Sequence, residues 1–336
     1  MSGRKVDVLV VGAGMTGLVA AKQAQEAGRS VLVVDKGRSV GGRLATRRLG
    51  KGAADHGAQF FTARTPEFQA AIERWMRLGL VYLWAMGWST GSFGKHEEQG
   101  HPRYAVRDGM NKLAKHLAQG LDVDLNVRLV RLERDEQGWM ARGDGEEAYQ
   151  AHAVILTPPV PQSLALLDAG GVMLPEAERA ALERLRYAPS LAGLFRIEGK
   201  TRIPPPGAVQ RPAEAITWIA DNRMKGISPD ETVVTVHGGG SYSRRYWNST
   251  DKEILGNMQE VLARYLVADA RIVEGQLKRW RYAFPETVHP ERALRSQNPL
   301  PLIFAGDAFG GPRVEGAYLS GLAAGAALQE EDDTPP

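Results

Sequence analysis

Residues 6–17 have the sequence VDVLVVGAGMTG, an apolar run that ends in a glycine-rich turn. The run Val6–Val11 is short, rich in β-branched residues and bounded by glycine, which predicts a buried strand. Met15–Ala27 follows with small residues on one side and Gly28 at its end, which predicts a closely packed helix. Val31–Asp35 predicts a second buried strand. Because parallel strands need a helical crossover, this order predicts the start of a parallel sheet in an α/β fold.

The glycine-rich turn has the GxGxxG spacing of a dinucleotide-binding loop. Gly12 permits a tight turn, Gly14 lets the backbone approach a pyrophosphate, and Gly17 lets helix and strand pack closely. The N–H groups that begin the helix would face the phosphates. Asp35 lies 23 residues after Gly12 and would accept hydrogen bonds from ribose hydroxyls. The alternative is a turn without a ligand. The residues predicted to bind the dinucleotide are Gly12, Ala13, Gly14, Met15, Thr16, Gly17, Asp35 and Lys36.

A second glycine-rich stretch, Gly37–Lys51, also contains several arginines and is predicted to be a long functional loop. Within it, Gly42 and Arg43 follow shortly after the ribose acid. A guanidinium suits phosphate oxygens, and adjacent glycines let a loop lie against a cofactor. We therefore expect Gly42 and Arg43 to bind the cofactor. For Arg43, Arg47 and Arg48 the alternative is a solvated basic loop.

A third motif lies near the C-terminus, where Leu302–Phe304 predicts a buried strand and Gly316–Leu328 predicts a helix rich in alanine and glycine. The strand ends in Gly306-Asp307, which places a carboxylate where it can meet a cofactor. The dipole at the start of the helix would stabilise negative charge there. The alternative is a helix used only for packing. The residues predicted to bind the cofactor in this motif are Gly306, Asp307, Val314, Gly316 and Ala317.

The remaining patterns predict two helices and two strands: Glu67–Leu78, Met110–Leu117, the alternating run 123–129, and Ala153–Thr157. Val130 and Leu132 shift the phase of the alternation, which indicates a bulge. The proline-rich run Pro158–Pro161 marks the predicted crossing between domains. The predicted division is a discontinuous cofactor-binding domain (1–65, 103–162 and 291–330), a mixed α/β substrate domain (66–102 and 163–290) and an acidic tail (331–336).

The composition of the 336 residues excludes several classes of protein. Hydrophobic residues make up 43% and charged residues 24%, which excludes disorder, and the net charge of +3 is too weak to indicate a nucleic-acid partner. The chain has no cysteine, which excludes disulfides, a Cys nucleophile and Cys-ligated metals, and the seven histidines show no metal-ligand spacing. Neither a secretory signal nor a membrane-length apolar stretch is present. We expect a cytoplasmic protein without a metal and without a membrane partner.

Together these motifs resemble the FAD-binding pattern of the flavin amine oxidase superfamily, and in particular the renalase family. The GGR sequence after Asp35 resembles the second fingerprint of flavoprotein oxidases. Asp55–Arg64 (DHGAQFFTAR) and Arg313–Ala317 with Ser320-Gly321 resemble the family's flavin-bordering and C-terminal signatures. Gly109-Met110 and Leu129–Leu132 resemble the region that meets the adenine. The resemblance implies a Rossmann-like FAD-binding domain, a second α/β substrate domain and non-covalent FAD. It adds these residues to the cofactor site: His56, Gly57, Ala58, Gln59, Phe60 and Leu129.

The resemblance also implies a reaction, the oxidation of 2- or 6-dihydro isomers of NAD(P)H by O2, which gives NAD(P)+ and hydrogen peroxide. Arg313 stands where many amine oxidases carry an aromatic residue, and a cation there would repel an alkylammonium substrate, although an amine that binds in its neutral form would escape this repulsion. The alternative for Arg313 is a salt bridge with Glu315 or Asp307. Other functions left open are an amine oxidase or desaturase, a non-catalytic flavoprotein and an NAD-dependent dehydrogenase. The aromatic candidates for the substrate wall, each of which could instead be a core residue, are Tyr104, Trp218, His237, Tyr246, Trp247, Trp280 and Tyr318.

Overall fold

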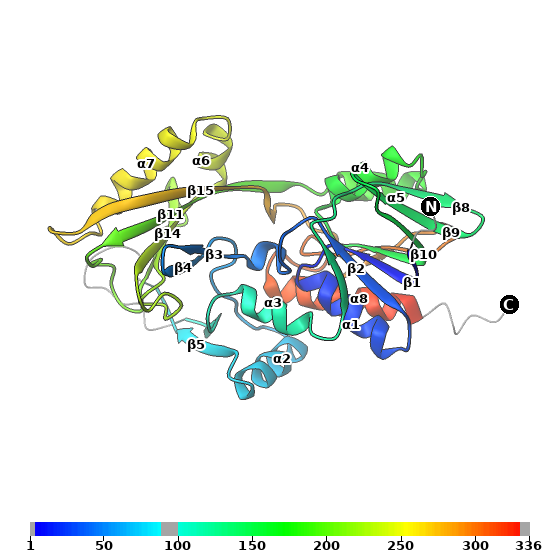
Figure 1. Cartoon of the computed structure of the whole chain (residues 1–336), viewed down its shortest axis with the longest axis horizontal. Helices are drawn as coiled ribbons and strands as arrows, with labels where there is room; N and C mark the ends of the chain where they lie inside the picture. Colours follow the sequence, from blue (N-terminus) through cyan, green and yellow to red (C-terminus); the bar gives the residue numbers. More distant parts are fainter. Residues whose placement is uncertain (1–3, 89–99, 330–336) are drawn as a thin grey trace. The chain divides into compact units, whose positions relative to one another are not determined.

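The computed structural model describes residues 4–88 and 100–329 and divides into two compact units (Figure 1). The predicted acidic tail, 331–336, lies outside the described residues. The boundaries between the units fall at residues 42/43, 113/114, 186/187 and 283/284. Unit 1 comprises Met1–Gly42, Ala114–Arg186 and Phe284–Pro336, and unit 2 comprises Arg43–Leu113 and Tyr187–Ala283.

Unit 1 is built on an eight-stranded sheet whose central strands are parallel. The apolar runs found in the sequence form the middle of this sheet, because strands covered on both faces carry continuous hydrophobic residues. In sheet order the strands are β16 (Leu294–Arg295), β17 (Leu302–Phe304), β10 (Ala148–Leu156), β1 (Arg4–Val11), β2 (Val31–Asp35) and β7 (Asp122–Leu125), with β9 (Gly138–Gly143) pairing with β10 and β8 (Leu129–Asp135) pairing with β9.

The helices of unit 1 include the first and the last helix of the chain, which lie side by side (Figure 1). A Cβ atom at Gly321 of the last helix would lie 2.7 Å from the backbone oxygen of Thr16 and 2.8 Å from Cβ of Val19, so glycine is required for this close packing. The helices are α1 (Met15–Glu26), α4 (Val160–Ala169), α5 (Glu176–Glu183) and α8 (Val314–Gln329), with α3 (Asn111–Leu117) crossing the unit boundary.

Unit 2 contains a five-stranded sheet that is covered on one face by two helices (Figure 1). Val234 and Val236 point to this helical face and pack with Ile254 and Met258 in a buried cluster. Because side chains alternate along a strand, Thr235 and His237 point to the other face. The strands are β12 (Ala208–Gln210), β13 (Ile216–Asp221), β14 (Thr232–Gly238), β11 (Tyr187–Glu198) and β15 (Arg271–Pro285), and the helices are α6 (Gly240–Arg245) and α7 (Asp251–Ala263).

The second face of this sheet is covered by the hairpin of β3 (Thr46–Leu49) and β4 (Gly52–Asp55). Leu49 and Ala54 of the hairpin form a buried cluster with Leu194 and Val233 of the sheet. The remaining elements of unit 2 are the one-turn helix η1 (Gly42–Leu44, which crosses the unit boundary), α2 (Pro66–Arg77) and the pair β5 (Val81–Ala85) and β6 (Arg103–Val106).

Two sequence expectations about local structure are corrected. Residues 123–129 do not form one strand, because Asn126 has a left-handed φ of 61° and separates β7 from β8. The stretch 37–51 is not all loop, since it contains η1 and β3. The predicted bulge is confirmed, because the pairing of β8 with β9 shifts between Leu129 and Arg131.

The division into units also differs from the predicted domains. Pro158–Pro161 lies inside unit 1, because these prolines begin helix α4, where a fixed φ is favourable and no N–H is needed. The chain leaves unit 1 at Arg186 instead. Residues 43–65 and 103–113 belong to unit 2, since the β3–β4 hairpin packs on the unit 2 sheet. The functional role of each unit stays a prediction.

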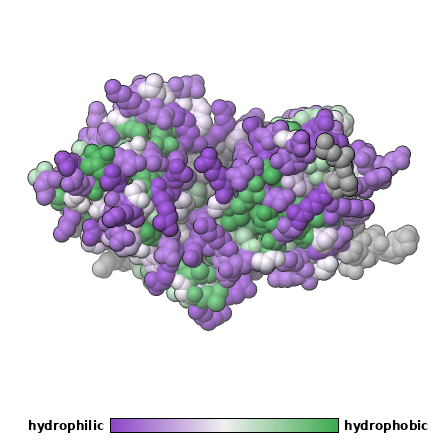
Figure 2. Space-filling model, viewed as in Figure 1, coloured by the Kyte–Doolittle hydropathy of each residue, from purple (hydrophilic) through white to green (hydrophobic). Residues whose placement is uncertain are grey.

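Hydrophilic side chains cover most of the face seen in Figure 2, and the hydrophobic side chains there form separate patches. Within residues 4–88 and 100–329, no helix is long and apolar enough to cross a membrane.

The contact between α1 and α8 can be tested with two matched substitutions in helices. Gly321→Ala should lower the free energy of unfolding by about 1–3 kcal/mol, because the new Cβ meets backbone that cannot move aside. Gly256→Ala in α7 should raise it by up to about 1 kcal/mol, because a Cβ there meets nothing within 4 Å and alanine favours a helix. Denaturant unfolding measures both, and equal effects would contradict the packing described.

Candidate functional site in two parts

The glycine-rich motifs converge at the carboxyl ends of the parallel strands of unit 1. Gly12 follows β1, Asp35 ends β2, Thr157 follows β10 and Gly306 follows β17. β1 lies between β10 and β2, so the strand order reverses beside it. In open α/β sheets, ligands bind at the carboxyl ends of the strands next to such a reversal. The topology therefore brings the N-terminal and C-terminal motifs to one ligand-binding edge.

The turn between β1 and α1 has the geometry of a phosphate cradle. A Cβ at Gly17 would lie 1.9 Å from the Gly12 carbonyl oxygen, so only glycine fits there. A Cβ at Gly14 would meet nothing within 4 Å, which leaves open space above this residue. No side chain caps the N-terminus of α1. Open space beside an uncapped helix N-terminus fits a diphosphate.

Asp35 holds this turn in place through both carboxylate oxygens. Oδ2 accepts from the Ala13 N–H at 2.6 Å, and Oδ1 accepts from the Gly37 N–H at 2.6 Å. Each oxygen keeps a further lone pair, so ribose hydroxyls can still donate to it. The predicted neighbours Lys36 and Gly42 lie at this edge, Lys36 bonded to Gln162 at 3.1 Å and Gly42 beside Gly14.

Helix α8 joins the same edge of unit 1 through two polar contacts. Ser320 Oγ accepts from the Gly306 N–H at 2.8 Å, and Thr16 Oγ1 donates to the Ala317 carbonyl at 2.8 Å. Ser320 was not predicted, although it belongs to the C-terminal signature. The other predicted members of this unit are Asp307 and Tyr318, both buried, and Met15, Leu129 and Val314.

Arg313 lies just before α8 and is exposed. Neither Glu315 nor Asp307 forms an ion pair with it, and no other residue in the described ranges does. The alternative of a structural salt bridge is therefore not observed. The guanidinium is available to an external group.

In unit 2, segment 55–60, which is predicted to border a flavin, is anchored by Asp55, whose side chain is fully buried. Its Oδ2 accepts from Lys225 Nζ at 2.6 Å, and its Oδ1 accepts from the Met110 N–H at 2.8 Å and from Thr46 Oγ1. Its carbonyl accepts from Thr235 Oγ1 at 2.8 Å. Side chain and backbone of one residue thus tie the segment to β3, to α3 and to the sheet.

Lys225 is the unpredicted partner in this network, and its side chain is also fully buried. Nζ donates to Asp55 and to the Gln59 carbonyl at 2.6 Å, and it lies 4.8 Å from the ring centre of Trp84. Burial lowers the pKa of Lys225, and the Asp55 carboxylate opposes that shift. Nothing in the sequence around Lys225 marks it, because its partners are 166–170 residues away.

The segment 55–60 lies over Thr235 and His237 on the hairpin face of the sheet. His237 is opposite Trp218 in the register of β13 and β14, and Phe60 lies 5.4 Å from Trp218 between ring centres. His56 stacks on Trp280 at 5.3 Å, and Trp280 Nε1 donates to the His56 carbonyl at 2.8 Å. This wall of aromatic and imidazole rings, comprising His56, Phe60, Trp218, His237 and Trp280, is called the ring wall below.

Several polar atoms of this region are buried without a hydrogen-bond partner: His56 Nδ1, Gln59 Oε1, Trp218 Nε1 and His237 Nε2. Native proteins rarely leave such atoms unpaired, so each needs an explanation. Gln59 Nε2 donates to the Asp55 and Gly57 carbonyls at 2.7 and 3.2 Å, which fixes the amide and leaves its oxygen free. A polar ligand would satisfy these atoms.

Both histidines of the ring wall are neutral at physiological pH. Burial lowers the pKa of His56 to about 3, helped by the positive charges of Lys278 and Arg47. Burial also lowers the pKa of His237 to about 4, with a further contribution from Lys225. The charges acting on the two rings are therefore cationic.

Other predicted residues take different places in unit 2. Gly57 approaches Arg43 so closely that a Cβ would lie 2.0 Å from the Arg43 oxygen, and the Ala58 N–H donates to that oxygen at 2.8 Å. The Arg43 guanidinium donates to the Tyr282 and Ala283 carbonyls at 3.4 and 3.3 Å. Its phosphate contact stays a prediction.

Besides Tyr318 of unit 1, three aromatic candidates, all in unit 2, are not part of the ring wall. Tyr104 is buried and stacks on Phe61 at 6.1 Å. Tyr246 and Trp247 pack on the helical face of the sheet, and Arg281 lies 5.5 Å from the ring centre of Trp247. Sequence spacing does not reveal which face of a sheet a later loop covers.

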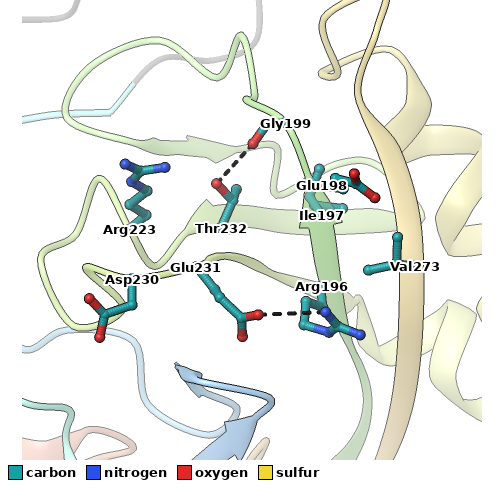
Figure 3. A pocket seen from close by; sticks show the side chains of 9 residues that line it. All are labelled: Arg196, Ile197, Glu198, Gly199, Arg223, Asp230, Glu231, Thr232 and Val273. Atoms are coloured by element: carbon teal, nitrogen blue, oxygen red, sulfur yellow. Dashed lines mark hydrogen bonds and ion pairs between the residues drawn. The ribbon is translucent and has the colours of Figure 1, made fainter.

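A separate hollow of about 270 Å³ lies in unit 2 among charged residues (Figure 3). Arg196 and Glu231 form an ion pair at 3.5 Å there, and Thr232 donates to the Gly199 carbonyl at 3.1 Å. None of its lining residues is a predicted site residue or carries an unpartnered buried atom. The hollow is therefore not the candidate site.

Two family models match the chain. The model of flavin-containing amine oxidoreductases matches residues 76–328, and that of an NAD(P)-binding Rossmann-like domain matches residues 10–75. The second match includes the glycine turn and Asp35. The predicted α/β fold class with a Rossmann-like domain is confirmed.

Individual proteins agree with these matches. The chain is 27% identical to renalase from Mus musculus over 235 residues, which cover 67% of this chain and 68% of the mouse protein. The structure of putrescine oxidase bound to putrescine has a TM-score of 0.72 at 18% identity and covers 98% of this chain and 100% of that chain. Cyclohexylamine oxidase from Brevibacterium oxydans IH-35A has a TM-score of 0.73 at 16% identity, with coverage of 98% and 100%. The two structures support the fold.

The buried pair can be tested by removing its cation. Lys225→Met should lower the free energy of unfolding by about 3–5 kcal/mol, because it leaves the Asp55 carboxylate buried and unpaired. Adding Asp55→Asn should recover part of the loss, because the uncharged amide removes the buried charge. Arg271→Met is the control, since its ion pair with Glu198 is 72% and 62% exposed and should contribute less than about 1 kcal/mol. Denaturant unfolding of the three variants gives the comparison, and similar losses in both single variants would contradict the assignment.

Proposed function

The chain belongs to the flavin-containing amine oxidoreductase family, and we propose that it oxidises 2- and 6-dihydro isomers of NAD(P)H. It is an FAD-dependent oxidoreductase whose sequence is renalase-like. In the proposed reaction, the dihydronicotinamide ring loses a hydride, and with one proton and O2 the products are NAD(P)+ and hydrogen peroxide. When bound, FAD supplies a two-electron acceptor that O2 can reoxidise, which no side chain of this protein provides.

In this proposal, residues of unit 1 bind the diphosphate and a ribose of the cofactor. The uncapped N-terminus of α1 and the open space above Gly14 suit the diphosphate. Asp35 suits the ribose of the adenosine half, because each of its oxygens can accept one more hydrogen bond. These contacts fix the position of the dinucleotide and perform no chemistry themselves.

The substrate class is supported chiefly by the sign of the charges around the ring wall. Lys278 and Arg47 act on His56, while the buried charges of Lys225 and Asp55 offset each other. Positive surroundings raise the free energy of a bound alkylammonium ion and leave an uncharged dihydronicotinamide unaffected. Planar rings also suit aromatic walls. The charges favour a dihydronicotinamide over a protonated amine.

The reaction requires no general base in the protein. Loss of a hydride converts the dihydronicotinamide directly into an aromatic pyridinium, and no proton leaves the substrate. The ring wall can then serve to orient the ring and to exclude water, which is consistent with two imidazoles held neutral by burial.

The substrate assignment is tested by anaerobic mixing. Either 2- or 6-dihydroNAD(P) should bleach the visible flavin absorption rapidly, whereas the ordinary 4-dihydro isomer should bleach it much more slowly. Admitting air should restore the absorption with formation of one hydrogen peroxide per substrate. If putrescine or cyclohexylamine bleached the flavin faster than the dihydronicotinamides, an amine oxidase would be the better assignment.

The cofactor site is tested with Gly14→Val. Because a Cβ at Gly14 meets nothing in the protein, and because the φ of this residue is −80°, the variant should fold with little loss of stability. Its side chain would occupy the space assigned to the diphosphate, so FAD should be lost on gel filtration. Gly17→Ala is the contrasting variant, since its Cβ would collide with the Gly12 oxygen and should impair folding itself. Full FAD content in folded Gly14→Val would contradict the site.

A further inference from the structure

We propose that the unpartnered ring wall atoms His56 Nδ1 and His237 Nε2, together with Gln59 Oε1, recognise an uncharged amide group on a planar ring ligand. This inference rests on the proposed function, in which the ligand is the carboxamide-bearing nicotinamide ring. The same chemistry, N–H and C=O groups on one ring edge, is also present on the flavin of FAD, and the experiment below separates the two sources.

The atoms belong to one neighbourhood within unit 2. Thr235 and His237 share a face of β14, and the Asp55 carbonyl accepts from both Thr235 Oγ1 and Gln59 Nε2, at 2.8 and 2.7 Å. His237 lies close enough to His56 for the charge of its ring to act on the His56 imidazole. Gln59 and Thr235 are thus tied to one carbonyl of segment 55–60, and His56 belongs to that segment.

The hydrogen-bonding roles follow from which atoms are already engaged. His237 Nε2 is buried and has no hydrogen-bond partner. A neutral imidazole has one donor and one acceptor nitrogen. With its proton on Nδ1, the neutral His237 ring presents Nε2 as an acceptor, as Gln59 Oε1 is. Two acceptors call for N–H donors, which a primary carboxamide supplies.

An ammonium group and a carboxylate both fit these atoms less well than an uncharged amide does. An ammonium group also offers N–H donors, but the positive charges of Lys278 and Arg47 act on His56 and disfavour a second cation there. A carboxylate suits that charge but offers no N–H to His237 Nε2 or Gln59 Oε1. An uncharged amide satisfies both conditions. The unpartnered Trp218 Nε1, opposite His237, is available to donate to the amide carbonyl.

The test uses the oxidised holoenzyme and two nonreducing probes, NAD+ and nicotinic acid adenine dinucleotide, which carries a carboxylate in place of the carboxamide. Calorimetric titration should show tighter binding of NAD+.

The variants of His237 use the different reach of two amide side chains. The amide of Gln reaches the position of Nε2 in histidine, and that of Asn reaches the position of Nδ1. His237→Asn should therefore weaken NAD+ binding about tenfold or more, with little change for the acid analogue, and His237→Gln should retain most of the affinity.

His56 should show the opposite pattern, because its unpartnered atom is Nδ1. His56→Asn should retain NAD+ affinity and His56→Gln should lose it, a reversal that a purely structural role would not produce. His101→Gln, at an exposed histidine, is the control. FAD content and the visible flavin spectrum of each variant are measured alongside.

The outcomes separate this inference from the proposed function. If the variants change FAD content or the flavin spectrum while the preference for NAD+ stays the same, the recognised amide belongs to the cofactor. If wild-type protein binds no NAD+ but the variants alter the flavin spectrum, the substrate assignment fails and amide recognition stands. If neither NAD+ binding nor any flavin property changes in any of the variants, the inference is overturned.

Discussion

A buried ion pair controls the part of unit 2 that carries the candidate chemistry. Asp55 and Lys225 have no exposed side-chain surface, and each side chain bonds to the other and to one backbone group, the Met110 N–H for Asp55 and the Gln59 carbonyl for Lys225. Burying two charges is costly, and their attraction repays that cost only when the remaining hydrogen bonds are made. The geometry of segment 55–60 is therefore fixed by a requirement for complete pairing. The positions of His56 and Gln59, and of their unpartnered atoms, therefore depend on the pairing of Asp55 with Lys225.

The sequence predicted the local, glycine-dependent parts of the fold well and the long-range polar parts poorly. Gly12, Gly17 and Asp35 act within one βα unit, so their spacing carries the information. Lys225 was missed because a lone lysine carries no periodic signal, and its partner is 170 residues away. Trp247 was placed on the substrate side, but the structure packs it against the helical face. Alternating side chains along β14 predict that the strand has two faces. They do not reveal which other segment of the chain covers each face.

The charges near the ring wall affect both the substrate and the product of the proposed reaction. The substrate ring enters uncharged, and the product pyridinium carries a positive charge. Lys278 and Arg47 raise the free energy of that product beside His56. In the proposed reaction, the same charges would disfavour an alkylammonium ion and promote departure of the oxidised ring. Neutral imidazoles are suited to this setting, because protonated ones would add to the repulsion and lose an acceptor.

The position of β17 and α8 in unit 1 has a consequence for biosynthesis. Both follow β10 and α1 by more than 140 residues in the chain, although β17 pairs directly with the central strand β10 and α8 packs on α1. Until residues 302–329 leave the ribosome, β10 has an unpaired edge on that side, and the apolar surface of α1 is uncovered. Such edges and surfaces are sites of aggregation and chaperone binding. The nascent chain therefore cannot close the dinucleotide edge until residues 302–329 have been made, so stable FAD binding has to follow synthesis of this segment.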